Sequence, residues 1–280
     1  MEKDLQNINQ IFNKKFFRIP DYQRGYSWGK KQLDDFWEDL QLLLGKDYHY
    51  TGLLTYEKIK NFKDSDDSKL KEDYSYDACY VIDGQQRLTT ISILLKCILN
   101  LFKDNELIID ETKKDCEKKF LYKKIEGYEY FIFGYESDNP SNYYFKNSVM
   151  ERPVSNEEYK KQTIYTNKLA FAKSYFEEKL KDFDKTELKN LFKKLTSQLK
   201  FNTYEVDSNI EVFVIFETMN NRGKGLSKLE LLKNRLIYLS TKLPDNDLDK
   251  EKLRAEINDS WKVIYNHLGL NLRNILDDDE

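Results

Sequence analysis

The sequence is poor in the residues on which most metal and nucleophile chemistry depends. Its 280 residues include three cysteines, Cys79, Cys97 and Cys116, and two histidines, His49 and His267. The cysteines form neither a metal-site spacing nor an even disulfide set, so they predict a reducing cytoplasm. Two histidines disfavour a zinc hydrolase or a histidine-based metal nuclease, and a serine or cysteine triad would have to use one of them.

Other absences narrow the function further. The sequence has no Gly-x-x-x-x-Gly-Lys-Ser/Thr loop, which excludes an ordinary P-loop NTPase. It has no apolar signal core at its start and no run of membrane-spanning length, which predicts a soluble, cytoplasmic protein. Forty-six basic and forty-nine acidic residues give a net charge of −3, so any nucleic-acid surface must be a local patch.

The remaining composition suits a folded chain with a sizeable core. With 40% hydrophobic residues, 280 residues are enough for one large domain or one and a half. Apolar spacing predicts helices over about 33–44, capped by Ser27, and over 168–180, 186–199 and 248–268, with strands over 48–56 and 201–206. The aromatic segments 128–134 and 143–145 are interpreted as short strands or aromatic loops, and residues 58–77 as a charged, solvated excursion.

The most informative stretch is Tyr80–Thr90, with the sequence Tyr-Val-Ile-Asp-Gly-Gln-Gln-Arg-Leu-Thr-Thr. It predicts a β-branched strand, a break at Asp83-Gly84, and a helix that begins at the glycine or just after it. A helix that opens behind a strand in this way directs its first N–H groups and the positive end of its dipole at one spot. The stretch therefore predicts an anion site, and phosphate is the expected ligand.

The phase of this helix assigns different surroundings to its polar residues. Gln85, Gln86 and Thr89 project away from the apolar stripe, whereas Arg87 falls close to it and needs a carboxylate or phosphate partner. Asp83 would repel a bare phosphate, which suggests that it coordinates a metal, contacts a hydroxyl or pairs with an arginine. An alternative is that Asp83 and Gln86 form a capping box, which needs no ligand.

Two other loops carry arginines that could hold an anion. The segment 16–28 contains Tyr22, Gln23 and Arg24 among aromatic residues, and could stack on a base and bind a phosphate. Alternatively, its own rings pin it to the core. The second loop follows residue 217 and carries Asn220 and Arg222, which could wrap an anion.

An alternative interpretation of the loop with Asn220 and Arg222 is a flexible turn with solvated charges. Ser227 and Glu230 form a capping box for the helix beyond it. The lysine pairs between residues 113 and 124 alternate with acids, which favours a solvated helical face over a nucleic-acid patch.

Four sequence blocks together resemble the N-terminal domain family of GmrSD-type restriction systems. They are Ile19–Trp28, Tyr50-x-Gly52, Val81–Thr90 and Phe216–Ser227, in matching order over about residues 5–240. The resemblance implies an α+β fold with a ParB/sulfiredoxin-like mixed-sheet core. It implies a nucleotide-handling domain over 1–240, with helical insertions at about 100–200. Residues 241–280 would be a helical segment that leads to a nuclease domain absent here.

The resemblance also implies a function. Family members bind and hydrolyse nucleoside triphosphates and act in defence against modified foreign DNA, with a His-Asn-His-type nuclease as a separate domain or subunit. By matching position, the catalytic residues would be Asp83, Gln85, Gln86 and Arg87, and Mg²⁺ would be held partly by Asp83. The phosphate-binding neighbours would be Gly84, Tyr22, Gln23, Arg24, Asn220 and Arg222.

Two alternatives stay open at this point. One is a non-enzymatic module that binds DNA or senses its modification, and the other is a ParB-like DNA nickase. The sequence leaves the preferred nucleotide, the recognised modification and a homo-oligomeric state undecided, and it predicts no membrane partner.

Overall fold

The computed structural model describes most of the chain, with gaps at both ends and in several loops. The described residues are 5–20, 23–43, 45, 47–59, 75–126, 128–136, 141–153, 157–206, 227–241 and 247–270. Tyr22 lies outside them, as do the loop that carries Asn220 and Arg222 and most of the charged 58–77 segment.

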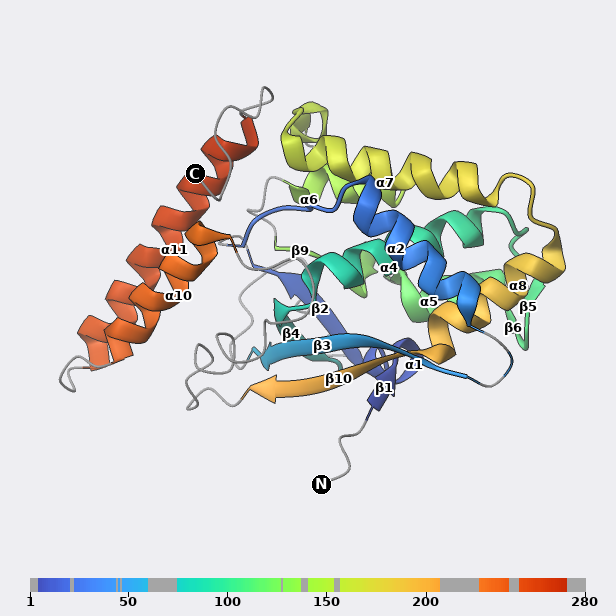
Figure 1. Ribbon diagram of the computed structural model, residues 1–280, viewed down its shortest axis with the longest axis horizontal. Coiled ribbons are helices and arrows are strands. Elements are labelled where there is room, and N and C mark those ends of the chain that lie inside the picture. The colour runs from blue at the N-terminus through green and yellow to red at the C-terminus, as the bar shows by residue number, and fades with distance from the viewer. Residues whose placement is uncertain are drawn as a thin grey trace.

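A mixed six-stranded sheet forms one layer (Figure 1). In spatial order its strands are β1 (Leu5–Asn7), β10 (Leu199–Val206), β3 (His49–Lys58), β4 (Asp77–Asp83), β2 (Lys15–Ile19) and β9 (Phe133–Tyr135). Strands β10 and β3 are parallel, as are β4, β2 and β9, whereas β1 with β10 and β3 with β4 are antiparallel. The predicted α+β class and mixed sheet are confirmed.

Helices cover the sheet, and one of them, α4 (Gln85–Asn100), is surrounded by other elements. The helical elements are α1 (Ile8–Ile11), α2 (Lys30–Leu42), α4 (Gln85–Asn100), α5 (Lys113–Phe120), α6 (Ser141–Tyr144), α7 (Ile164–Leu180), α8 (Lys185–Lys193), α10 (Lys228–Thr241) and α11 (Asp247–Leu270). Shorter turns lie at Phe145–Val149, Glu157–Lys160 and Lys194–Gln198, and two hairpins pair β5 (Leu107–Ile108) with β6 (Glu111–Thr112) and β7 (Tyr122–Ile125) with β8 (Tyr128–Phe131). None of the described helices is long and apolar enough to cross a bilayer.

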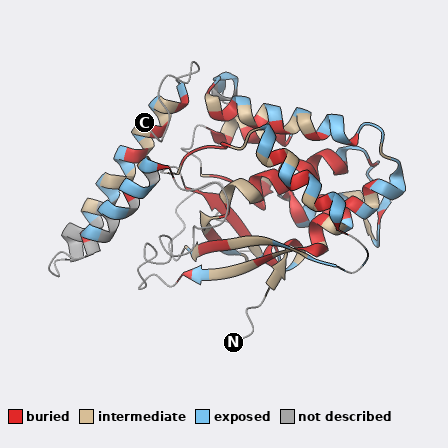
Figure 2. Ribbon diagram, viewed as in Figure 1, coloured by how far each residue is buried: buried red, intermediate tan, exposed pale blue. Residues whose placement is uncertain are grey.

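Helix α4 is buried on every side beyond its first turn, as Figure 2 shows. Every residue from Leu88 to Leu99 is buried, because α5, α7, α8 and β9 all pack around it. The predicted single apolar stripe is therefore wrong in this respect. Thr89 was expected to face away from the core but is 1% exposed, since a helix surrounded by other elements has no solvent face.

Two local predictions are also corrected. Helix α2 begins after Gly29 rather than Ser27, because the Gly29 carbonyl accepts the first helical hydrogen bond, from Leu33 N at 3.1 Å, and Gln32 Oε1 accepts from Gly29 N at 2.9 Å. The segment 143–145 is helical, not a strand or an aromatic loop. Phe145 makes edge-to-face contacts with the rings of Phe133 and Tyr135, and this tertiary packing outweighs the local β propensity.

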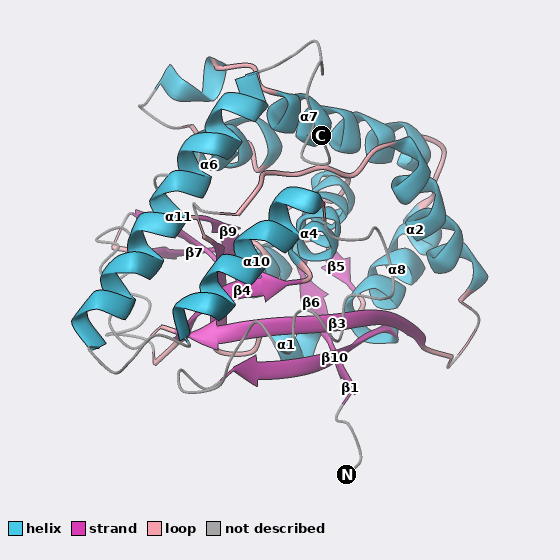
Figure 3. Cartoon of the chain, turned by 60° about the vertical axis from the view of Figure 1, so that its left-hand side comes forward, coloured by secondary structure: helices cyan, strands magenta, loops and turns pink. Residues whose placement is uncertain are grey.

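Helices α10 and α11 stand side by side at one flank of the molecule (Figure 3). The indole Nε1 of Trp261 donates to the carbonyl of Leu229 at 3.3 Å, which joins the two helices. Trp261 and Tyr265 are buried, as the spacing of the C-terminal helix predicts.

The carboxylate of Glu151, which is 44% exposed, ties α4 to α7. Glu151 has a φ of +57° and accepts from Lys173 Nζ at 2.7 Å and from Asn100 Nδ2 at 2.9 Å, and it also pairs with Lys96 Nζ at 3.2 Å. Burial works to raise the pKa of Glu151, but the Lys173 hydrogen bond and the Lys96 charge outweigh it and hold the pKa at about 2.

The low pKa of Glu151 makes stability depend on pH. The ionised carboxylate contributes stability that is fully present above its ordinary pKa of 4.5 and is lost as pH falls through about 2. We expect Glu151→Gln to be less stable than the wild type at about pH 6, and the difference to narrow below about pH 4.5. Urea unfolding across this range measures it, with exposed Glu178→Gln as the control. A difference that stays constant with pH would contradict the assignment.

Candidate functional site

The candidate site is the turn that joins β4 to α4. Gly84 is the N-cap residue of α4 and has a φ of +96°, a left-handed conformation that disfavours a side chain. A Cβ there would also lie 3.0 Å from Leu54 Cδ1. Gly84 has no side chain that could cap this helix, and among the described residues no side chain accepts from the backbone N–H groups of Gln85, Gln86 or Arg87, which therefore suit an anion. The predicted start of the helix is confirmed.

The side chain of Arg87 holds this turn against β3. Its Nη2 donates to the Leu53 carbonyl at 2.6 Å and to Asp83 Oδ2 at 3.2 Å, and its Nη1 donates to the Thr51 carbonyl at 3.2 Å. The Arg87 and Asp83 side chains are 18% and 25% exposed. The guanidinium therefore joins β3, through Thr51 and Leu53, to the end of β4 at Asp83, and it remains partly exposed to solvent.

Close approach of the guanidinium depends on Gly52. This residue has a φ of +122°, and a Cβ on it would overlap Nη1 of Arg87. The strand register is irregular next to Gly52, where β3 pairs with β10. A glycine inside a strand is the sequence signal of such a close approach.

Asp83 pairs with an arginine, one of the three roles that its position suggests. Burial raises the pKa of the Asp83 carboxyl, and the Arg87 charge and the Gly84 backbone N–H oppose that shift. The alternative capping box does not form, because the N-cap residue is Gly84 and the Gln86 side chain turns to another loop.

The loop after β2 lies directly on this turn. Gln23 Nε2 donates to the carbonyls of Val81 and Ile82 at 2.9 and 3.3 Å. The Gln86 amide, at the start of α4, also binds this loop. Its Oε1 accepts from Ser27 N at 2.7 Å, and its Nε2 donates to the Gly25 carbonyl at 3.2 Å. The structure thus brings together two segments that are about 60 residues apart in the sequence.

Aromatic side chains anchor this loop, as its alternative interpretation predicts. The Tyr26 hydroxyl lies 2.8 Å from Thr90 Oγ1, and the Tyr26 ring is 1% exposed. Trp28 packs on the core and is partly buried. The sequence analysis assigns no role to Thr90, because the burial of this side of the helix depends on tertiary packing.

The two neighbouring glutamines differ in their surroundings. Both ends of the Gln86 amide are engaged within the chain, so Gln86 positions the loop. The Oε1 of Gln85 is buried and accepts no hydrogen bond from the described residues. Arg24, in the same loop as Gln23, is buried at 6% exposure. Tyr22, Asn220 and Arg222 lie outside the described residues.

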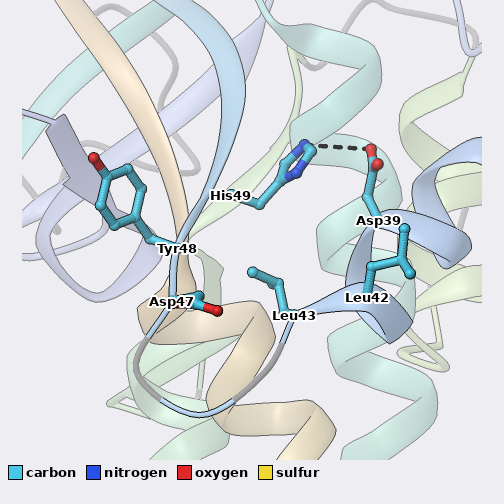
Figure 4. Close-up of a pocket in the computed structure, with 6 residues that line it drawn as sticks. All are labelled: Asp39, Leu42, Leu43, Asp47, Tyr48 and His49. Atoms are coloured by element: carbon cyan, nitrogen blue, oxygen red, sulfur yellow. Dashed lines mark ion pairs between the residues drawn. The ribbon is translucent and has the colours of Figure 1, made fainter.

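A hollow of about 470 Å³ near the start of β3 is a separate feature (Figure 4). His49 and Asp39 point toward each other across it, with Nε2 3.3 Å from Oδ2. Its other lining residues are Leu42, Leu43, Asp47 and Tyr48. Two aspartates make this hollow unsuited to a triphosphate, and His49 is a strand residue there, as predicted.

The donor set at Asp83 limits which metal it could hold. Nowhere in the described part of the chain do three His, Cys, Asp or Glu side chains converge on one point. Mg²⁺ is commonly held by one or two carboxylates together with substrate phosphates. Asp83, which is a quarter exposed, fits that arrangement but not a metal site made of protein ligands alone.

Comparison with known protein families gives a match over most of the chain. The family model described as "GmrSD restriction endonuclease, N-terminal domain" matches residues 7–237. No curated protein matches the chain.

Proposed function

Because the chain belongs to the GmrSD restriction endonuclease N-terminal domain family, it is a component of a restriction system, and we propose that it binds and hydrolyses a nucleoside triphosphate at the Asp83-Gly84 turn. Turnover would switch a partner His-Asn-His-type nuclease that cuts modified foreign DNA. The observation that supports this proposal is the N-terminus of α4, which no side chain of the described residues caps and which lies beside the Arg87 guanidinium.

In this mechanism the phosphates lie against the first N–H groups of α4. The backbone N–H groups of Gln85, Gln86 and Arg87 would bind phosphate oxygens, since an N-terminal turn leaves them without helical partners. Arg87 would add positive charge at the same place. The Gln85 side-chain oxygen, which no described residue engages, would orient the attacking water, as glutamines do in other phosphoryl-transfer sites.

Mg²⁺ would supply charge neutralisation of the phosphate oxygens when bound. Asp83 would hold it together with those oxygens. Burial raises the pKa of Asp83, while Arg87 favours its ionised, metal-binding form. Gln86 and Gln23 would act indirectly, because their amides hold the Gly25–Ser27 loop and the end of β4 in place.

We expect Gln85→Ala and Asp83→Asn each to lower triphosphate turnover by about 100-fold or more, because each removes a group that acts on the reacting phosphate. Phosphate release from purified protein measures this. Glu129→Gln is the matched control, because Glu129 also pairs with an arginine, at 3.3 Å from Arg152, and is 26% exposed. Undiminished turnover in both site variants would remove this turn from the mechanism.

A module that binds DNA without nucleotide is the second candidate. Thermal unfolding distinguishes the two, since a ligand stabilises the state that it binds. A non-hydrolysable triphosphate with Mg²⁺ should raise the melting temperature of the wild type and not of Asp83→Asn. Stabilisation by DNA alone, with no effect of triphosphate, would favour the second candidate.

A further inference from the structure

A second pocket of about 520 Å³ lies at the other end of β2 and β4. Three parts of the sequence line it: α1 with the turn after it, the residue before β4, and the consecutive elements β6, α5 and β7. Its lining residues are Asn9, Phe12, Asn13, Lys14, Tyr76, Glu111, Asp115, Lys118, Lys119 and Lys123.

This pocket is basic, unlike the chain as a whole. Four of its lining residues are lysines and two are acids, whereas the net charge of the chain is −3. Lys118 pairs with Asp115 at 3.0 Å and Lys119 with Glu111 at 3.1 Å, and all four side chains are between 42% and 52% exposed. Exposed pairs of this kind are worth little, so a phosphate could exchange for the carboxylates at small cost.

The other two lysines have no carboxylate partner among the described residues. Lys123 Nζ lies over the Tyr76 ring, 4.5 Å from its centroid, which fixes the amine at the pocket wall. Lys14 has a φ of +52°, and the carbonyl of Lys14 accepts from Asp77 N at 2.9 Å. The backbone at Lys14 is thus held at the start of β4, and its side chain extends from a fixed point.

The strand pairing separates this pocket from the triphosphate site. Strands β2 and β4 are parallel, with Lys15 opposite Asp77, so both begin at the pocket. Both lead to the candidate site, since β4 ends at Asp83 and Gln23 follows β2. Seven residues of extended strand span about 20 Å, which is too far for one triphosphate to reach both places.

We propose that this pocket binds the phosphodiester backbone of a nucleic acid. Lys14 and Lys123 contact phosphates directly, and Lys118 and Lys119 exchange their carboxylates for phosphates on binding. Electrostatic binding of this kind is independent of sequence and falls steeply with salt. The pocket is separate from the Asp83-Gly84 turn, so this inference stands whether or not the chain hydrolyses a triphosphate.

The test is binding of a fluorescent DNA duplex by the full chain, measured by anisotropy between about 50 and 200 mM KCl. Lys14→Glu/Lys123→Glu is expected to weaken binding at least 10-fold and to lower the slope of log K against log salt by about 2, because two phosphate contacts are lost. Lys160→Glu/Lys181→Glu is the matched control. It makes the same charge change at lysines that are 57% and 67% exposed and do not line the pocket.

Further measurements separate this site from the triphosphate site. The pocket variant should retain triphosphate turnover and the wild-type unfolding midpoint, and Asp83→Asn should retain DNA binding. Equal weakening by the pocket and control variants would overturn the proposal, because it would mean that only net charge matters. Competition by inorganic tripolyphosphate at stoichiometric concentration would also overturn it, since that result identifies a site for free phosphates.

Discussion

Arg87→Ala is expected to lower the free energy of unfolding by about 2–4 kcal/mol and to abolish triphosphate turnover, because it strips partners from three oxygens at once. The Leu53 and Thr51 carbonyls and the Asp83 carboxylate all accept from this one guanidinium. Removing it leaves Asp83 as a largely buried, unpaired charge and frees the turn from β3. Urea unfolding and phosphate release on the same preparation measure both effects.

The control for this prediction is Arg152→Ala. Arg152 is also partly buried, at 29% exposure, and also pairs with a carboxylate, but its guanidinium stacks on the Tyr122 ring, 3.9 Å from the centroid. It should cost about 1–2 kcal/mol and leave turnover intact, because it lies away from the turn. Arg87→Lys keeps the charge but not the fork geometry, so it should recover only part of the stability. A loss below about 1 kcal/mol in Arg87→Ala would mean that the three contacts are dispensable.

Gly52→Ala is expected to reduce stability by about 2–4 kcal/mol, since it combines an unfavourable φ with a steric clash. The added Cβ would overlap Nη1 of Arg87, and the φ of +122° disfavours any side chain. The guanidinium would have to leave the Thr51 carbonyl, and triphosphate turnover should fall with it. Unfolding and turnover assays report the two consequences separately.

Two comparisons isolate the clash from the backbone strain. Gly45 also has a positive φ, +57°, but its Cβ would meet nothing within 4 Å, so Gly45→Ala should cost only about 1 kcal/mol. In the double variant Gly52→Ala/Arg87→Ala the clash partner is gone. Its loss of unfolding free energy should therefore be smaller than the sum of the losses in the two single variants. Full additivity would show that Gly52 does not act through Arg87.

Several features of the fold were predictable because local patterns determine them. The Asp-Gly break and the apolar run after it predict the start of α4, and alternating residues predict β10. The surroundings of α4 were not predictable in the same way. An apolar face in the sequence shows only that a helix has one buried side. Thr89 is buried because β9 and α7 also pack against α4.

The candidate site, too, was predictable from the sequence only in part. The residue types at Asp83–Arg87 indicate an anion site from the sequence, because a glycine break, amides and a guanidinium at a helix start favour a phosphate. The hydrogen-bond partner of each side chain, by contrast, depends on residues far away in the sequence. The Arg87 fork reaches carbonyls of β3 more than 30 residues away, and Gln86 reaches a loop about 60 residues away.

The sequence by itself therefore determined the position of the turn and indicated an anion as its ligand, since both depend on neighbouring residues, and the family resemblance of its four blocks implied the class of fold. Tertiary structure alone decided that Arg87 is a crosslink between strands, that Gln85 keeps an unengaged oxygen, and that lysines from separate segments share one pocket. The physical reason is that hydrogen bonds and charge pairs across the sheet form only after distant segments pack together. Their partners leave no regular spacing in the chain.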